Sequence, residues 1–283
     1  LYSSPYPVEI ALPILAPLIY RFSPIRLSDV GGKSNPLPNY SLPPVPFQTY
    51  LSNSCPAMTL PTLRASEHLH DVKYEIRGAL ARRAEQLQRE GHEIIKLNIG
   101  NPGAFGFRMP GSMRVAIVEN LHQADPYSHQ KGIFPAREAV VMQAQNRGVM
   151  DVTADDVFIG NGVSELIMLA MRALLNPDDE VLVPSPDYPL WTASVVIHGA
   201  QAVHYPCRPE QDFVPDPAEV EALVTDRTRA IVAINPNNPT GAVYPRQVLA
   251  ALAGMAERRH LVFCADEIYD EMLYDGAEFV PCA

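Results

Sequence analysis

Lysine, tryptophan and cysteine are scarce in this sequence, and the positions of the lysines and cysteines limit the functions that the chain can have. Its 283 residues include a single tryptophan, and no lysine follows Lys131. The cysteines fall in no C-x-x-C or metal-ligand spacing, which indicates reduced thiols of a cytoplasmic protein. They are Cys55, Cys207, Cys264 and Cys282. The eight histidines show no ligand spacing with acidic or cysteine partners either, so we expect no metal site.

Positive charge is also in short supply. The formal net charge is −10 and the pI is about 5.2, which disfavours contact with nucleic acid or with an anionic membrane surface. The most apolar N-terminal run, residues 8–20, contains Pro13 and Pro17 and is too short to span a bilayer. It follows no basic segment, so we expect no signal peptide. With 47% hydrophobic residues, the chain can nevertheless build a substantial core.

Residues 1–65 differ in composition from the rest. They are dense in proline, poor in charge and without helical periodicity, so we expect an extended or disordered segment. The first methionine is Met58. One hypothesis is therefore that the natural chain starts there and that the upstream part is a non-native leader.

The stretch Arg229 to Gly241 organises the rest of the chain. Its apolar run 230–234 suits a strand covered on both faces, and it ends in the loop N-P-N-N-P-T-G. Pro245 can occupy the first turn of the next helix, and a second apolar run, 261–265, ends at Asp266. Strand, loop, helix and strand place residues 235–238 and Asp266 side by side at the carboxyl edge of a parallel sheet, where ligands of open α/β sheets bind.

Strand and helix patterns alternate from residue 157 onward. We expect strands at 157–159, 180–183 and 202–205, and helices at 164–175, at 190–198 and after an Asp216 cap in a capping box with Glu219. Before them we expect a helix from Val72 to Gly91, a short strand at 94–99 and a helix at 136–147. This alternation predicts an α/β fold with a largely parallel central sheet flanked by helices.

Two positions in these elements are candidate ligand contacts. The G-N-G-V-S-E turn at 160–165 leads from a strand into a helix, where free N–H groups and the helix dipole favour a phosphate. The alternative is an ordinary turn with Ser164 as N-cap. Asp266, at the end of a buried strand, must be hydrogen-bonded or paired with a cation. It either caps the next helix or binds a protonated ligand nitrogen, which Tyr269 would also reach.

Two other patterns also have alternative interpretations. Tyr188, in P-D-Y-P at the end of a strand, offers a flat face on which a ring could stack, or it packs under a loop. The run ending in Asp266 is also typical of P-loop NTPases. The only candidate phosphate loop, at 31–34, has Leu27 where its first glycine belongs, so we exclude that class.

Five motifs together resemble the class I/II aminotransferases, which are fold-type-I pyridoxal-phosphate enzymes. They are K-L-N-I-G-N-P, G-N-G-V-S-E, P-S-P-D-Y-P-L-W, N-P-N-N-P-T-G and A-D-E-I-Y-D. The chain is most similar to bacterial alanine-type members, from about Ser66 to its end. The resemblance implies an N-terminal arm and part of the small domain at 66–115, and a partial cofactor-binding large domain at 116–283, incomplete at its C-terminus.

The resemblance also implies how pyridoxal phosphate is held. Gly162, Val163 and Ser164 would bind its phosphate, and Tyr188 would stack on its ring.

The other implied contacts lie on the ring edge and at the substrate. Asn238 and Tyr269 would hydrogen-bond the phenolic oxygen, and Asp266 would keep the ring nitrogen protonated. Gly100, with Asn238, would contact the substrate carboxylate. Tyr127 would reach the phosphate in the neighbouring subunit of a homodimer.

The family's Schiff-base lysine, the arginine that binds the substrate carboxylate, and a phosphate-binding serine and arginine follow the Asp-x-x-Tyr motif, where this chain has none in the expected places. Its lysines are Lys33, Lys73, Lys96 and Lys131. We therefore expect a truncated chain with no catalytic residue of its own, which forms no covalent cofactor adduct alone.

Three functions are compatible with these observations. The first is an aminotransferase acting on an amino acid, alanine or glutamate, and a 2-oxo acid. The second is a lyase of the same fold, because the same cofactor supports elimination. The third is a non-catalytic scaffold that keeps the ring-binding edge.

Overall fold

The computed structural model describes residues 64–74 and 78–282, and the structural statements concern these residues. The chain divides into two compact units, Leu1–Glu67 and His68–Ala283. Only residues 64–67 of the first are described, so the predictions for the proline-rich segment and for Met58 lie outside the described residues. The boundary between the expected segments 66–115 and 116–283 stays a prediction.

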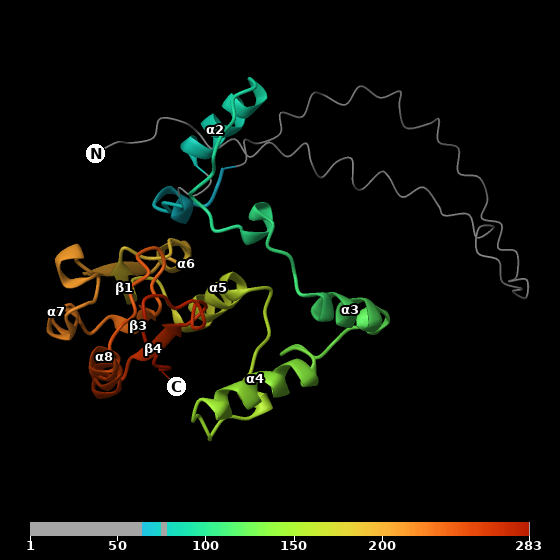
Figure 1. Cartoon of the computed structure of the whole chain (residues 1–283). Coiled ribbons are helices and arrows are strands. Elements are labelled where there is room, and N and C mark those ends of the chain that lie inside the picture. The colour runs from blue at the N-terminus through green and yellow to red at the C-terminus, as the bar shows by residue number, and fades with distance from the viewer. Residues whose placement is uncertain (1–63, 75–77, 283) are drawn as a thin grey trace, which may run out of the picture. The chain divides into compact units, whose positions relative to one another are not determined.

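The second unit is built on a four-stranded parallel sheet (Figure 1). Its strands are β1 (Glu180–Ser185), β2 (Gln201–Pro206), β3 (Thr228–Ile234) and β4 (Val262–Asp266), in the order β2-β1-β3-β4. The α/β prediction is thereby confirmed. Because all strands run in the same direction, their carboxyl ends meet at one edge, as expected for β3 and β4.

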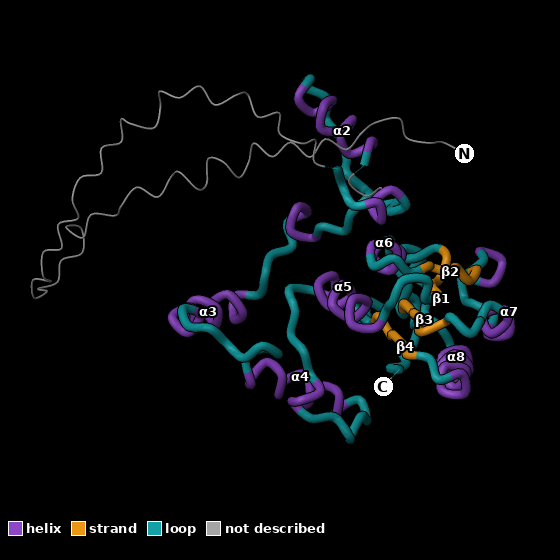
Figure 2. Tube along the Cα trace, turned by 180° about the vertical axis from the view of Figure 1, so that it is seen from behind, coloured by secondary structure: helices purple, strands orange, loops and turns teal. Residues whose placement is uncertain are grey.

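Helices cover both faces of this sheet (Figure 2). Helices α5 (Val163–Leu174) and α6 (Leu190–Ile197) lie on one face, and α7 (Pro217–Ala222) and α8 (Arg246–Arg259) on the other. In β1, Val181 and Val183 belong to the apolar cluster with α5 and α6, whereas Leu182 belongs to the cluster with α7 and α8. Successive strand residues point to opposite faces, so burial of both faces explains the uninterrupted apolar runs.

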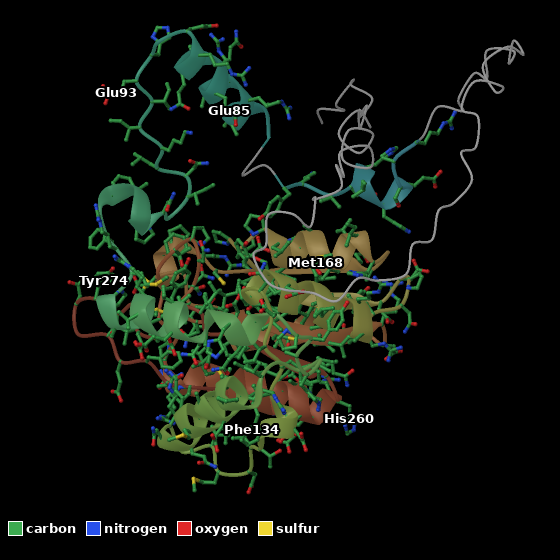
Figure 3. All side chains as sticks on the ribbon, turned by 90° about the vertical axis from the view of Figure 1, so that its right-hand side faces the viewer. Glu85, Glu93, Phe134, Met168, His260 and Tyr274 are labelled. Atoms are coloured by element: carbon green, nitrogen blue, oxygen red, sulfur yellow. The ribbon has the colours of Figure 1, made fainter. Side chains whose placement is uncertain are left out.

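Local signals set the ends of the helices on the second face. The Asp216 carboxylate accepts a hydrogen bond of 2.8 Å from the Ala218 N–H and caps α7, as predicted. Glu219 does not complete the expected capping box; its carboxylate pairs instead with Arg208 at 2.7 Å. Pro245 is the N-cap of α8 rather than part of its first turn. The helix stops at His260, labelled in Figure 3, whose φ of 56° is left-handed.

In the described part of the chain, three helices precede α5 and the sheet. They are α2 (Ala79–Arg89), α3 (Gly111–Asn120) and α4 (Phe134–Asn146), and Arg137 is the only residue among them that is buried. Short 3₁₀ turns join the elements: η2 (Glu67–His70), η4 (Pro102–Phe105), η5 (Leu121–Ala124), η6 (Ala154–Asp156) and η7 (Pro209–Gln211). Among the described residues no helix combines the length and apolarity that crossing a bilayer requires.

Three expectations about the segments before β1 are wrong. Residues 94–99 and 157–159 form no strand. The Ile159 N–H donates to the Lys131 carbonyl at 2.8 Å instead of joining the sheet. The helix expected from Val72 begins only at Ala79, so the apolar spacing that included Val72 extended the prediction too far.

Candidate functional site

A pocket of about 460 Å³ lies at the carboxyl edge of the sheet. It is lined by the last residues of β3 and β4, Ile234 and Asp266, by the first residue of α5, Val163, and by the segments that follow β1, β3 and β4. Residues 98–100 complete the lining together with Tyr74. The parallel strand direction thus brings together segments that lie far apart in the sequence.

Most of the predicted site residues line this pocket. They are Gly100, Val163, Tyr188, Asn238, Asp266 and Tyr269. Gly162 and Ser164 flank Val163 in the chain but are not among the lining residues. Tyr127 is fully exposed and does not line the pocket. The structure therefore groups six of the nine, and the role of each stays a prediction.

Asp266 is the charged group at the base of this edge. It is 3% exposed, its Oδ2 accepts a 2.8 Å hydrogen bond from Trp191 Nε1, and its Oδ1 accepts a long one of 3.4 Å from the Ile268 N–H. Residues 267–282 form turns rather than a helix, so Asp266 is not the N-cap considered as the alternative. A carboxylate has about four acceptor positions, and this one keeps acceptor capacity for a ligand donor.

At the opposite edge of the sheet, the buried carboxylates are paired with arginines. Asp179 pairs with Arg229 at 2.9 Å, and Glu180 pairs with Arg227. Hydrogen bonding from Thr225, together with Arg227, holds the pKa of the Glu180 carboxyl below its usual value. Asp266 has no cationic side chain within ion-pair distance among the described residues, which suits a cationic ligand atom.

The start of α5 provides a second anchor. Gly162 is its N-cap with φ of 77°, a left-handed conformation that favours glycine. The N–H groups of the first helical turn have no partner within the helix, which makes this end suitable for a phosphate. Ser164 lies inside the helix and is not its N-cap. Its Oγ is 3.3 Å from the Tyr188 hydroxyl, so the helix start and the aromatic wall of the pocket are in contact.

The asparagine-rich loop after β3 contains three asparagine side chains with different contacts. The Asn235 side-chain oxygen accepts from the Tyr244 N–H at 2.8 Å, and that of Asn237 accepts from the Thr240 hydroxyl at 2.8 Å. Both are buried and hold the loop in shape. Asn238 is half-buried and lines the pocket. Two asparagines therefore build the loop, and the third is presented to a ligand.

Sequence reasoning missed several groups at this site. Asp187 lines the pocket, and its Oδ2 accepts a 2.7 Å hydrogen bond from the Thr192 hydroxyl. Trp191 reaches Asp266 from the first turn of α6. Tyr188 and Trp191 are three residues apart, a helical spacing that could have suggested a shared direction. No local pattern indicates that the indole meets a strand end 75 positions later.

The fold and the pocket together define a three-layer α/β protein with a pocket at the carboxyl edge of its sheet, where proteins of this class bind small molecules. The profile of the family "Aminotransferase class I and II" matches residues 92–283. The chain belongs to this family, as the motifs predicted.

Individual relatives agree with this assignment. Over 216 residues the chain is 50% identical to the glutamate-pyruvate aminotransferase AlaA of Escherichia coli K12, covering 76% of this chain and 53% of that protein. It is 49% identical over 219 residues to an alanine aminotransferase of Mycobacterium bovis, covering 77% and 51%. The chain thus spans about half the length of the curated relatives it matches.

Solved structures give the same result. A crystal structure of an aminotransferase from Escherichia coli superimposes with a TM-score of 0.77 at 49% identity, over 78% of this chain and 55% of that one. An alanine aminotransferase from Pyrococcus furiosus gives 0.73 at 37% identity, over 77% and 56%.

This family implies pyridoxal phosphate as the cofactor, and the pocket fits it. The cofactor combines an aromatic ring, a ring nitrogen that can carry a proton, and a phosphate. Asp266 has acceptor capacity free, Tyr188 provides an aromatic wall, and the start of α5 provides N–H donors. The three chemical parts therefore have matching groups around one pocket.

Proposed function

We propose that the protein containing this chain is a pyridoxal-phosphate-dependent aminotransferase, which moves an amino group between an amino acid and a 2-oxo acid. The observation that carries the proposal is the buried Asp266 carboxylate, which opens onto the pocket beside Tyr188 and Asn238. The names of the relatives in Escherichia coli and Mycobacterium bovis support alanine and glutamate as the amino acids.

Each of the predicted site residues has a definite task in this proposal. The bound cofactor supplies an electron sink that stabilises negative charge at the substrate's α-carbon. Asp266 accepts the hydrogen bond of the protonated ring nitrogen and so keeps the proton there. Tyr188 stacks on the ring, and Asn238 and Tyr269 donate hydrogen bonds to its phenolic oxygen.

The phosphate and the substrate occupy the two ends of the pocket. Gly162, Val163 and Ser164 hold the phosphate at the start of α5, where the helix dipole favours negative charge. Gly100 and Asn238, both in the lining, contact the substrate carboxylate.

Proton transfer at the α-carbon is assigned to no residue of this chain. Among the described lysines, Lys73, Lys96 and Lys131 do not line the pocket.

A homodimer is part of the proposal. Tyr127 lies on the surface and away from the pocket lining, which suits a residue that serves the phosphate site of a second subunit.

We also place the protein in the cytoplasm, which fits the free thiols of Cys207, Cys264 and Cys282.

The activity is tested on the protein expressed from its whole gene. An aminotransferase releases pyruvate from alanine only when a 2-oxo acid such as 2-oxoglutarate is supplied, and it forms glutamate in equal amount. A lyase of the same fold releases pyruvate from cysteine or cystathionine without any 2-oxo acid. Turnover of none of these substrates by cofactor-loaded protein would contradict the proposal and favour the non-catalytic scaffold.

A further inference from the structure

Trp191 is the only tryptophan of the chain, and it touches the group on which the proposed function depends. Its indole is 5% exposed and belongs to the apolar cluster between the sheet and helices α5 and α6. Its Nε1–H donates to Asp266 Oδ2 at 2.8 Å, and both partners are buried. The indole body is thus held by packing while its single donor points to the carboxyl edge of the sheet.

We propose that Trp191 is a positioning residue that fixes the Asp266 carboxylate for the ring nitrogen of the cofactor. This inference rests on the proposed function and extends it to a residue outside the pocket lining.

The physical reason is the difference between the two carboxylate oxygens. Oδ2 accepts the indole hydrogen bond, whereas Oδ1 has the long 3.4 Å contact with the Ile268 N–H. Rotation of the Asp266 side chain would leave a buried indole N–H without an acceptor, which is unfavourable. The carboxylate is therefore held in one orientation before the cofactor binds. Binding then costs little conformational entropy at this side chain.

The backbone around Trp191 adds to this restraint. The Trp191 N–H donates to the Tyr188 carbonyl at 3.0 Å, so the tryptophan and the stacking tyrosine belong to one turn. Tyr188 in turn contacts Ser164 at the start of α5. One short segment at the start of α6 thereby sets both the aromatic wall and the carboxylate orientation.

The test is a double-mutant cycle on the full-length protein, read out as the dissociation constant of pyridoxal phosphate in equilibrium dialysis. Trp191→Phe keeps an aromatic ring in the core but removes the donor, and we expect cofactor affinity to fall roughly tenfold. Asp266→Asn removes the negative charge and should weaken binding more. In the Asp266→Asn background, Trp191→Phe should have no further effect on the dissociation constant, because the charge it orients is gone.

Tyr205→Phe is the matched control. The Tyr205 hydroxyl is buried on the other face of the sheet and donates to the Val232 carbonyl at 2.7 Å. Its removal also deletes a buried hydrogen bond from an aromatic side chain, so it should lower stability while leaving cofactor affinity unchanged.

The outcomes separate this inference from the proposed function. If Asp266→Asn weakens cofactor binding but Trp191→Phe does not, or if the two effects simply add, Trp191 is only a core residue and the inference fails alone. If Asp266→Asn leaves the affinity unchanged, the assignment of the pocket fails with it.

Discussion

The sheet with helices α5–α8 and the helices α2–α4 that precede it both contain apolar side chains, yet they bury them to very different extents. In the first region Val181, Ile231 and Leu252 are completely buried. In α2, α3 and α4 only Arg137 is buried, and it is a charged residue. Figure 3 labels one apolar example, Phe134 at the start of α4, whose exposed fraction is 55%.

The contrast shows that the sheet region can form its own core, whereas the preceding helices need a covering from elsewhere. Met113, Val115, Ile117 and Val118 of α3 are each about half or more exposed and are distributed around the whole helix. Exposed apolar side chains on several sides of one helix are typical of a surface that packs against another part of a larger assembly. The second subunit of the proposed homodimer is one such covering.

The largest expected loss of stability comes from truncating a leucine in the sheet region, compared with truncating a leucine in the region before it. Leu252→Ala, in the cluster between β1, β3 and α8, should destabilise the chain by about 3 kcal/mol, since it leaves a cavity in a packed core. Leu121→Ala, directly after α3, should change stability by less than about 0.5 kcal/mol, since that side chain is 63% exposed. Denaturant unfolding of a monomeric sample measures both, and equal losses would remove the contrast.

Arg137 is the one buried residue of helices α2–α4, and its replacement should have an intermediate effect on stability. Arg137 donates to the Gly132 carbonyl at 3.1 Å and to the Ala154 carbonyl at 2.6 Å. Arg137→Leu should cost roughly 2 kcal/mol, because both carbonyls lose their donor. Faster amide hydrogen exchange confined to the segments around Gly132 and Ala154 would show this local loss of stability. Arg82→Leu on the exposed side of α2 is the control, and an equally large loss there would contradict the account.

Acid should weaken the sheet region through Glu180, with a smaller effect than either substitution. Hydrogen bonding from Thr225 and Arg227 lowers the pKa of Glu180 from its ordinary 4.5, so its stabilising contribution is present above that value. The contribution is lost as the pH falls through the lower folded-state pKa. Glu180→Gln should therefore flatten the pH dependence of the unfolding free energy below about pH 4.5. An unaltered profile in the Glu180 variant would refute the assignment.

Sequence patterns predicted the strands β1–β4 and the helix that became α4, but they wrongly predicted strands at 94–99 and 157–159. The runs that became β3 and β4 are apolar on both faces, a pattern that specifies burial between two helix layers without knowledge of distant partners. Residues 157–159 carry the same local signal, but a strand forms only where another segment pairs with it, and the Ile159 N–H donates to the Lys131 carbonyl instead.

The candidate site divides in a similar way. Asp266, Asn238 and Tyr188 could be predicted because each follows a recognisable strand end and belongs to a motif. The role proposed for Trp191 could not, because it depends on how α6 crosses the sheet and meets the end of β4. The structural role of Asn235, which accepts a hydrogen bond from the Tyr244 N–H, also became visible only in the structure.

Amide hydrogen exchange of the full-length protein with and without pyridoxal phosphate tests the central claim most directly. The account predicts that the cofactor slows exchange in four segments that converge on one pocket, 160–166, 187–191, 235–239 and 266–269. Protection that spares the segment containing Asp266, or that appears instead around Lys73 and His204 at the separate pocket beside β2, would contradict it.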